Sequence, residues 1–281
     1  MYPKTYSCSP EEFLRNVRIP TRIMQDEAGM MEEIAQLMYE AILAKANDGR
    51  TVLICPVGPI GQYSLLAEKI NAGHTMLSHV WFINMDEYLT DDDKYTDDPN
   101  LSFRVFMEQE FFSLILPELR PAEDRCIFPD PLDPTALDML LERLGHADLS
   151  LTGVGINGHL AFNEPPSGES GITDEDYSTL GTRILSIPQA TIINNAARKF
   201  RGVLELFPRR CITIGMKQLL DCKKIKIYLY CDWQWGAMRK LSLEPPSRFC
   251  PASFLQLHSD AEMVITRDLY EFMFECTCTS W

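Results

Sequence analysis

A glycine-rich segment that follows an apolar run constrains the fold of this chain more than any other feature. The run Ala147–Thr152 predicts a buried strand, and the segment Gly153–Pro165 comes directly after it. Its thirteen residues include three glycines, one histidine, one carboxylate and two side-chain amides. Such a segment adds nothing to a hydrophobic core, whereas a parallel α/β sheet places its active site at the carboxyl ends of its strands. The chain is therefore predicted to be an α/β protein with a site built around this loop.

The composition favours one globular domain that covers residues 1–281. Apolar residues make up 46% of the chain and charged residues 23%, which is enough for a large buried core. Lysine and arginine number 26 against 40 acidic residues, a formal net charge of −14. This charge disfavours binding to nucleic acid or to an anionic membrane surface, because both attract basic proteins.

The nine cysteines predict a reducing compartment rather than a disulfide scaffold. They are odd in number, they form no pair of CxxC motifs, and several lie in apolar runs where a thiol is an ordinary core residue. Cys276 and Cys278 lie close together, but we expect no metal site and no disulfide there. With no signal-peptide pattern and no apolar run of about 18 residues, a cytoplasmic location without a membrane span is expected.

Apolar runs of strand length alternate with stretches of helical periodicity along most of the chain. Strands are predicted at 51–55, 80–85, 148–152, 183–187, 211–214, 225–230 and 262–266, and helices at 24–47, 62–71, 101–115 and 134–144. This alternation predicts a mainly parallel sheet with helices on both faces. The acidic segment 90–100 is predicted to be a solvated loop, and the polar segment 167–179 is a candidate for a mobile lid.

His159 is the strongest candidate for acid–base chemistry in the glycine-rich loop. A lone histidine is more often structural, but Glu164 lies five residues on in the same turn-rich segment. Its carboxylate can accept a hydrogen bond from one ring nitrogen and orient the other, and Asn157 can complete this relay. Because histidine titrates near neutral pH, it can give and take a proton on a sugar oxygen.

The same loop matches the glycine pattern of dinucleotide-binding folds, with glycines at 153, 155 and 158. That pattern must open a helix, and Pro165-Pro166 follows too soon for one. Nucleotide binding is therefore disfavoured. The glycines are expected instead to let backbone amides approach a substrate oxygen, with Gly158 as a candidate for substrate binding.

Two adjacent acids, Asp86 and Glu87, follow the second predicted strand. Only one of them can point into a crevice at the end of that strand. Partial burial there raises the pKa of a carboxyl group toward that of a usable general base. We expect Asp86 to be catalytic and take Glu87 as a candidate for substrate binding.

The loop 56–61 joins the first predicted strand to its helix, a place where phosphate groups commonly meet backbone amides. Gly58 and Gly61 are the candidates for substrate contact in this loop. Two prolines remove amide donors, and the loop contains no serine or threonine. A phosphate site and a tight structural turn both stay open as interpretations.

Five segments together resemble the glucosamine-6-phosphate deaminase/isomerase family, which is related to the 6-phosphogluconolactonases. The sequence Asn-Met-Asp-Glu-Tyr at 84–88 is similar to the family's catalytic-base motif, and residues 155–165 look like its ring-opening motif. The remaining segments, which fall in the family's order, are 101–104, 211–216 and 254–258. The resemblance extends from the first strand to about Thr266.

This resemblance implies a three-layer α/β/α sandwich around a mainly parallel, Rossmann-like sheet. It implies that His159, oriented by Glu164 and Asn157, protonates the ring oxygen of a pyranose and opens the ring. Asp86 then carries a proton between carbons 1 and 2, ammonia leaves carbon 2, and a ketose phosphate is formed. Glucosamine 6-phosphate would become fructose 6-phosphate in amino-sugar catabolism, with no metal or organic cofactor. The family also suggests a homo-oligomer.

Several positions depart from the family pattern. Many relatives have aspartate where this chain has Asn157, and residues 58–60 replace the usual phosphate loop. The family's phosphate-binding lysine falls near Gln234, and its phosphate-binding arginine falls near Arg198 or Lys199. Leu185 stands where regulated members have a basic residue in their allosteric site, so activation by an acetylated sugar phosphate is not expected.

Three alternatives follow from these departures. The same chemistry on a different or non-phosphorylated sugar is the first, because the loop and Gln234 each remove phosphate ligands. A 6-phosphogluconolactonase-like hydrolase is the second, although the motif at 84–88 argues against it. A non-catalytic sugar sensor is the third, although Asp86, His159 and Glu164 are all present.

Overall fold

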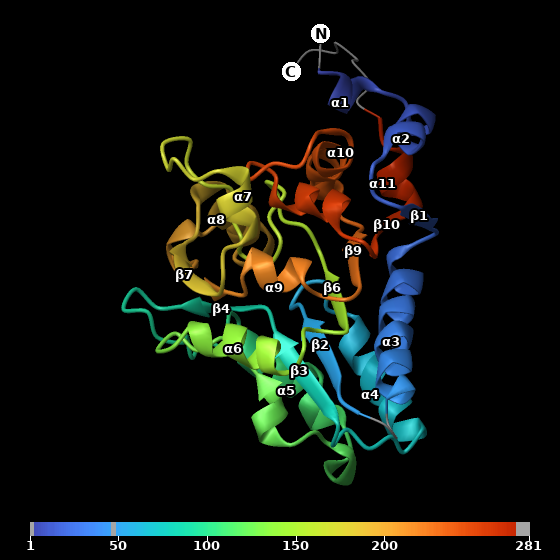
Figure 1. The fold of residues 1–281 in the computed structure, drawn as a ribbon, viewed down its shortest axis with the longest axis vertical. Helices are drawn as coiled ribbons and strands as arrows, with labels where there is room; N and C mark the ends of the chain where they lie inside the picture. The colour runs from blue at the N-terminus through green and yellow to red at the C-terminus, as the bar shows by residue number, and fades with distance from the viewer. Residues whose placement is uncertain (1–2, 46–48, 274–281) are drawn as a thin grey trace.

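The computed structural model describes residues 3–45 and 49–273 (Figure 1). Its centre is a sheet of seven strands in the order β1-β10-β9-β6-β2-β3-β5, and every neighbouring pair is parallel. The strands are β1 (Thr21–Met24), β2 (Thr51–Cys55), β3 (Val80–Asn84), β5 (Cys126–Ile127), β6 (Leu149–Thr152), β9 (Ile225–Leu229) and β10 (Ala261–Thr266). The predicted mainly parallel sheet is confirmed.

The order of the strands reverses between β6 and β2. From β2 the chain moves outward through β3 to β5, whereas β6, β9 and β10 continue in the opposite direction. Loops that leave such neighbouring strands diverge, and the divergence opens a crevice at their carboxyl ends. The sheet order alone therefore selects the β2–β6 region for a ligand site.

A second, smaller sheet is antiparallel and was not predicted. Its order is β4 (Asp86–Leu89), β8 (Arg210–Thr213) and β7 (Arg183–Ser186). The expected strands 183–187 and 211–214 thus exist but belong to this sheet. Met85 alone separates β3 from β4, so the chain crosses directly from one sheet to the other beside Asp86.

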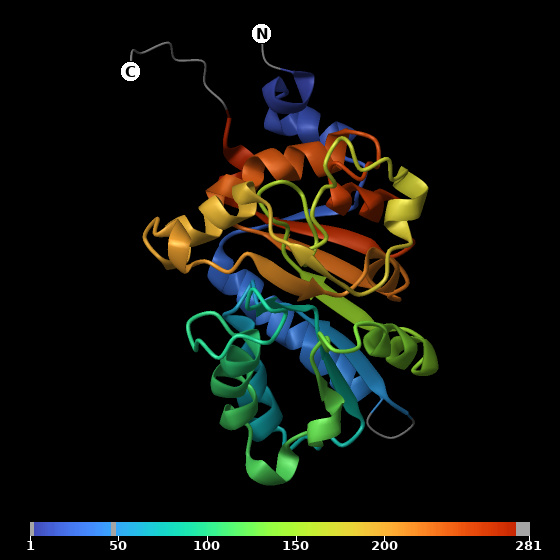
Figure 2. The ribbon, with the colours of Figure 1, turned by 90° about the vertical axis from the view of Figure 1, so that its left-hand side faces the viewer.

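Helices cover both faces of the parallel sheet, as Figure 2 shows. Alternation along β2 decides which side chains meet which layer. Leu53 and Cys55 pack with α3 (Glu27–Ala44) and α4 (Gln62–Ala72). Val52 and Ile54 pack on the other face. The elements there are α2 (Pro10–Asn16), α6 (Thr135–Arg143), α9 (Met216–Leu220), α10 (Trp235–Leu243), the 3-10 segment η6 (Pro251–Leu257) and α11 (Arg267–Glu271).

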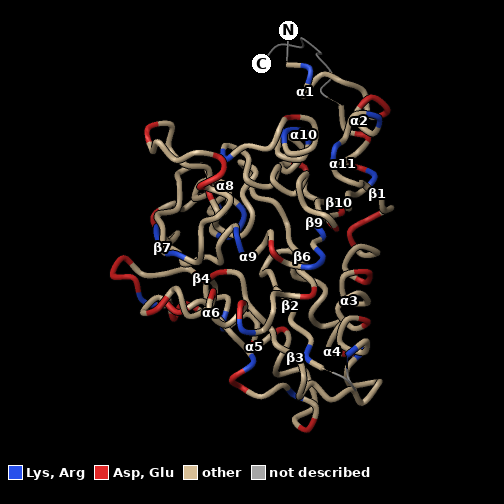
Figure 3. Tube along the Cα trace, viewed as in Figure 1, with Lys and Arg blue, Asp and Glu red and all other residues tan. Residues whose placement is uncertain are grey.

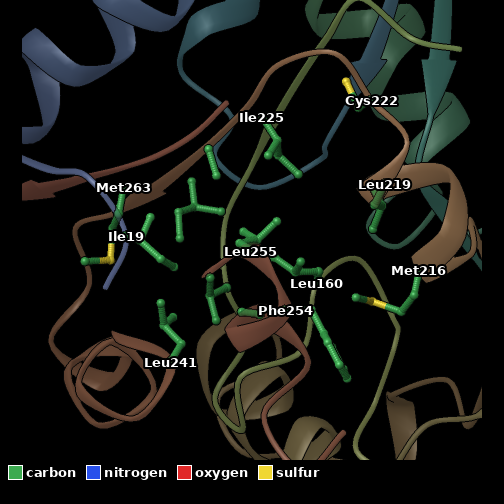
Figure 4. Packing of buried hydrophobic residues seen from close by; sticks show 14 of the residues in the cluster. Ile19, Leu160, Met216, Leu219, Cys222, Ile225, Leu241, Phe254, Leu255 and Met263 are labelled. Atoms are coloured by element: carbon green, nitrogen blue, oxygen red, sulfur yellow. The ribbon is translucent and has the colours of Figure 1, made fainter. Parts of the chain in front are cut away.

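Figure 4 shows part of this second core, in which Leu160 and Phe254 lie among residues of α9, α10 and β9. Leu160 belongs to the glycine-rich loop and is fully buried. Val154 and Phe162 of the same loop are also buried, so the loop is anchored in the core at several residues. The remaining helices are α1 (Lys4–Ser7), α5 (Phe103–Glu110), α7 (Asp174–Ser178) and α8 (Gln189–Lys199).

Two predicted helices begin or end elsewhere than expected. The helix expected at 24–47 begins at Glu27, because Asp26 accepts a hydrogen bond from the Gly29 amide at 2.8 Å and Met24 pairs with β10. Its expected last residues lie outside the described part of the chain, as do Cys276 and Cys278. The helix expected at 101–115 ends at Glu110, where Phe111 turns to φ −137° and packs against Phe82.

Acidic residues occur along the whole chain and gather in the loop after β4 (Figure 3). This loop, predicted at 90–100, lies outside every helix and strand. Among the helices that the structure describes, none combines the length and the apolar character needed to cross a membrane.

Candidate active site

A pocket opens where four neighbouring strands of the parallel sheet end. Its floor and sides come from the loops after β2, β3, β6 and β9. These loops contribute Pro56–Pro59, Met85–Asp86, 153–156, and Tyr230, Cys231, Trp233 and Gln234. Helix α8 closes one side with residues that include Thr191, Asn194, Asn195, Arg198 and Lys199. The sheet thus brings together loops that lie far apart in the sequence, and the predicted Asp86, His159, Gly58, Arg198 and Gln234 all line this pocket.

Asp86 lines the pocket but is nearly removed from solvent, with only 7% of its surface exposed. Burial, aided by the negative charge of Glu87, raises the pKa of Asp86 to about 8, although the positive charge of Lys199 acts in the opposite direction. A carboxyl group with a pKa in this range is a base strong enough to take a proton from carbon next to a carbonyl.

Glu87 points the other way, as alternation along β4 requires, and does not line the pocket. Its side chain is completely buried. Both carboxylate oxygens accept hydrogen bonds near 3 Å at the start of α5: from the amides of Tyr88, Phe103 and Arg104, and from the Ser102 hydroxyl. The expected contact of Glu87 with substrate is therefore not what the structure shows. Glu87 ties β4 to α5 and fixes the backbone beside Asp86.

Replacing Glu87 by alanine is expected to lower the free energy of unfolding by about 3 kcal/mol, because buried donors lose a charged acceptor. Chemical denaturation measures this loss. Glu108, which is exposed on the same helix, is the matched control, and its alanine variant should change stability by less than about 0.5 kcal/mol. Equal stability of the two variants would show that the hydrogen bonds to Glu87 contribute nothing.

His159 is held by the two residues predicted for it. Its Nδ1–H points at Asn157 Oδ1, 2.8 Å away, and at Glu164 Oε1, 3.0 Å away. Asn157 Nδ2 donates to the other carboxylate oxygen of Glu164 at 2.6 Å. Since both neighbours accept at Nδ1, the ring presents Nε2 as its remaining functional nitrogen.

Glu164 stays ionised although it is buried. Burial acts to raise the pKa of Glu164, but the charge of His159 and the hydrogen bonds from His159, Asn157 and Thr191 outweigh it and hold the pKa below its ordinary value. Thr191, at the start of α8, donates from its hydroxyl to Glu164 Oε1 at 2.7 Å. Nothing in the sequence singled out Thr191, because it lies 27 residues from Glu164 and only the packing of α8 brings it here.

Two glycines of the loop have structural roles. A Cβ on Gly155 would collide with the imidazole ring of His159. Gly158 adopts a φ of +88°, a conformation that favours glycine, and it does not line the pocket. The substrate contact expected of Gly158 stays a prediction, and its positive φ gives it a conformational role in the turn that carries His159.

The two candidate glycines of the loop after β2 and the candidate Gln234 have different positions relative to the pocket. Gly58 lines the pocket, whereas Gly61 lies outside it and packs close to Met31. Gln234 lines the pocket, but its amide joins two loops: Oε1 accepts from the amides of Tyr230 and Cys231, and Nε2 donates to Val154 O, all within 3.0 Å. Gln234 therefore holds two loops of the pocket together and adds no positive charge to it.

Two cations at the end of α8 supply the positive charge of the pocket. The guanidinium carbon of Arg198 lies 4.9 Å from the ring centroid of Trp233, and the ammonium of Lys199 lies 5.6 Å from that of Phe103. Neither forms a salt bridge with an acid among the residues that the structure describes. The segment 167–179, proposed as a lid, does not border this pocket.

This chain is similar to known proteins along most of its length. A glucosamine-6-phosphate deaminase of Shewanella loihica is 32% identical over 249 residues, which are 86% of this chain and 85% of that protein. One from Lachnoclostridium phytofermentans is 32% identical over 239 residues, 84% of this chain and 94% of that protein. This chain belongs to the glucosamine-6-phosphate deaminase family. No family model matches the sequence.

Solved structures agree with this family. A structure described as a monomeric glucosamine-6-phosphate deaminase superposes with a TM-score of 0.74 and 27% identity, and it covers 89% of this chain and 98% of its own. A 6-phosphogluconolactonase from Trypanosoma cruzi, at 14% identity and a TM-score of 0.66, shares the fold over 92% of this chain and 97% of its own. The predicted family and the α/β fold are both confirmed.

Proposed function

We propose that this protein converts an amino-sugar phosphate, glucosamine 6-phosphate, into a ketose phosphate and ammonia. The observation that carries the proposal is the pairing, in one pocket, of a buried carboxyl group with a histidine that is held by a carboxylate. Asp86 supplies a base whose pKa is raised to about 8, and His159 supplies an acid that faces the same space. The family membership of the chain supports this assignment.

The first step assigned to the pocket is opening of the sugar ring. His159 donates a proton from Nε2 to the ring oxygen while a water molecule takes the hydroxyl proton from carbon 1, so that the bond between carbon 1 and the ring oxygen breaks and the pyranose becomes an open-chain aldehyde. Glu164 and Asn157 keep Nδ1 protonated and hold the ring in place. The ionised Glu164 also stabilises the positive charge on the imidazole before it gives up its proton.

The second step is proton transfer at carbon 2. Asp86 takes the proton from carbon 2, which the neighbouring carbonyl at carbon 1 acidifies, and an enediol-type intermediate forms. The same carboxyl group returns the proton to carbon 1. The imine left on carbon 2 is hydrolysed by water to a ketone, and ammonia is released. No cofactor is required, because the substrate's own carbonyl and amine activate this carbon.

Arg198 is proposed to hold the phosphate group. It lies at the β9 side of the pocket over Trp233, away from Asp86, and it forms no salt bridge with any acid that the structure describes. A guanidinium presents paired donors that match phosphate oxygens. Gly58 offers a backbone amide from the opposite loop.

Ammonia release and ketose phosphate formation are the decisive measurements. Glucosamine 6-phosphate, galactosamine 6-phosphate and free glucosamine are compared at equal concentrations. Turnover of glucosamine 6-phosphate that exceeds turnover of free glucosamine by at least about 10²-fold supports the proposal, since charged hydrogen bonds to a phosphate contribute about 1.5–3 kcal/mol each. Turnover of none of the three amino sugars would overturn it.

A second candidate substrate is a non-phosphorylated amino sugar. Two observations favour it: the amide of Gln234 is engaged by backbone groups, and Gly61 at the start of α4 lies outside the pocket. Both features remove phosphate ligands. Efficient turnover of free glucosamine in the same assay would select this candidate.

We further propose a cytoplasmic location and a homo-oligomeric assembly. The location rests on the free cysteines, seven of which lie in the described part of the chain. The assembly rests on the family resemblance, although one solved relative is described as monomeric. Light scattering on the purified protein measures the assembly state.

A further inference from the structure

Lys199 is a charged residue of the pocket to which the proposed reaction steps assign no role. It is the last residue of α8 and lines the same pocket as Asp86 and His159. Its ammonium lies 5.6 Å from the ring centroid of Phe103 and 6.0 Å from that of Tyr88. Tyr88 belongs to β4, two residues after Asp86, so these rings hold the ammonium at the Asp86 end of the pocket.

The two cations of α8 therefore serve opposite sides of the pocket. Neighbouring residues on a helix point about 100° apart. Arg198 accordingly reaches Trp233 beside β9, whereas Lys199 reaches the aromatic residues beside β4. A phosphate bound by Arg198 leaves Lys199 near the carbons on which Asp86 acts.

We infer that Lys199 is the cation that balances the negative charge passed between Asp86 and the substrate during proton transfer. The inference rests on the proposed function. In the free protein Lys199 and the Asp86 carboxyl group line the same end of the pocket, and the reaction begins from the ionised form of Asp86. When Asp86 takes the proton from carbon 2, the C–H electron pair forms the double bond between carbons 1 and 2, and the carbonyl electrons move to the oxygen on carbon 1. The negative charge thus moves from the carboxylate to that oxygen and stays beside the ammonium.

The charges around Lys199 and Asp86 agree with this role. Asp86 and Glu87 both act on Lys199 as negative charges, although burial and the neighbouring Arg198 together lower its pKa. A preorganised cation costs little reorganisation when charge moves from one oxygen to another within its reach. The titratable groups around Asp86 are Lys199 on α8, His159 after β6, and Tyr63, Tyr88 and Cys211, whose raised pKa values leave them neutral. Glu87 on β4 points away from the pocket and acts on Asp86 only through its charge.

Lys199→Met, which keeps the length of the side chain without its charge, tests the inference against Arg198→Met. The first variant is expected to lower kcat about 10²-fold while KM changes less than about threefold, because it removes charge stabilisation made in the transition state. Arg198→Met is expected to raise KM more than about tenfold, because it removes substrate binding. Lys199→Arg should recover part of the lost kcat. A rise in KM with unchanged kcat in Lys199→Met would make Lys199 a phosphate ligand and overturn the inference.

The pH profile provides a readout that a structural role would not move. Lys199 acts to lower the pKa of Asp86, so the acid limb of kcat/KM should shift to higher pH in Lys199→Met. An unmoved limb would contradict the inference. If the wild-type protein turns over no amino sugar, the proposed function fails by itself. Carboxyl carbon NMR of Asp86, assigned with Asp86→Asn, then still shows whether its titration midpoint rises in Lys199→Met, and an unchanged midpoint would refute the pairing.

Discussion

Replacing Asp86 by asparagine is expected to lower kcat about 10³-fold while the protein stays folded. Asparagine keeps the size and the hydrogen-bonding atoms of the side chain but cannot take a proton, and general-base catalysis contributes about 10²–10⁴-fold. Ammonia release at saturating substrate measures the loss. Asp86→Glu, which retains a carboxyl group at a shifted position, should keep more activity than the asparagine variant. Retained wild-type turnover in Asp86→Asn would remove Asp86 from the mechanism.

The pKa of Asp86 also fixes the sign of the pH dependence. With a pKa of about 8, Asp86 is increasingly protonated below that pH, so kcat/KM is expected to fall about tenfold per unit below it. Because burial raises the folded pKa above the unfolded value, Asp86 destabilises the fold as pH rises from about 4 to about 8. Asp86→Asn should therefore be more stable than the wild type at pH 9 but not at pH 4. If kcat/KM instead fell only below about pH 4, the pKa of Asp86 would not be raised and this prediction would be wrong.

The second large loss of activity is expected when His159 is replaced. His159→Gln should lower kcat about 10²-fold or more, because glutamine donates a hydrogen bond but cannot protonate the ring oxygen. Ammonia release from the cyclic amino-sugar phosphate measures this step. An open-chain alditol phosphate, which needs no ring opening, should bind the variant and the wild type within about threefold.

Glu164→Gln serves as the comparison variant for His159. It removes the charge that faces Nδ1 and leaves His159 in place, so its expected loss in kcat is smaller than that of His159→Gln. Ammonia release from the same substrate measures this smaller loss. If the two variants bound the alditol phosphate much more weakly than the wild type, His159 would be a binding residue rather than a proton donor.

Much of the site could be inferred before the structure was known, because its signals are local. The segment 153–165 contains a histidine, a carboxylate and an amide within eight residues, and their side chains meet in the structure within 3.0 Å. Asp86 was assigned from its place after an apolar run. The strands of the parallel sheet except β1 and the two-residue β5, and the helices α4 and α6, followed from periodicity, which depends on neighbours in sequence.

The contacts of the site that could not be predicted from the sequence are made by residues that lie far apart in the chain. Thr191 reaches Glu164, and Lys199 lines the same pocket as Asp86, only because α8 closes one side of that pocket. The direction of Glu87, the two loops that Gln234 holds together and the antiparallel sheet likewise depend on pairings such as Asp86 with Thr213. Spacing along the chain gives no measure of such contacts.

The sequence by itself thus determined the family, the parallel sheet and the chemical groups of the site, since each rests on short patterns of residues. The tertiary structure alone decided which acid faces the pocket, how far the pKa of Asp86 is raised, and which side of the pocket each cation of α8 serves. Burial and charge proximity are properties of the folded chain, because water and distance set the free energy of an ion.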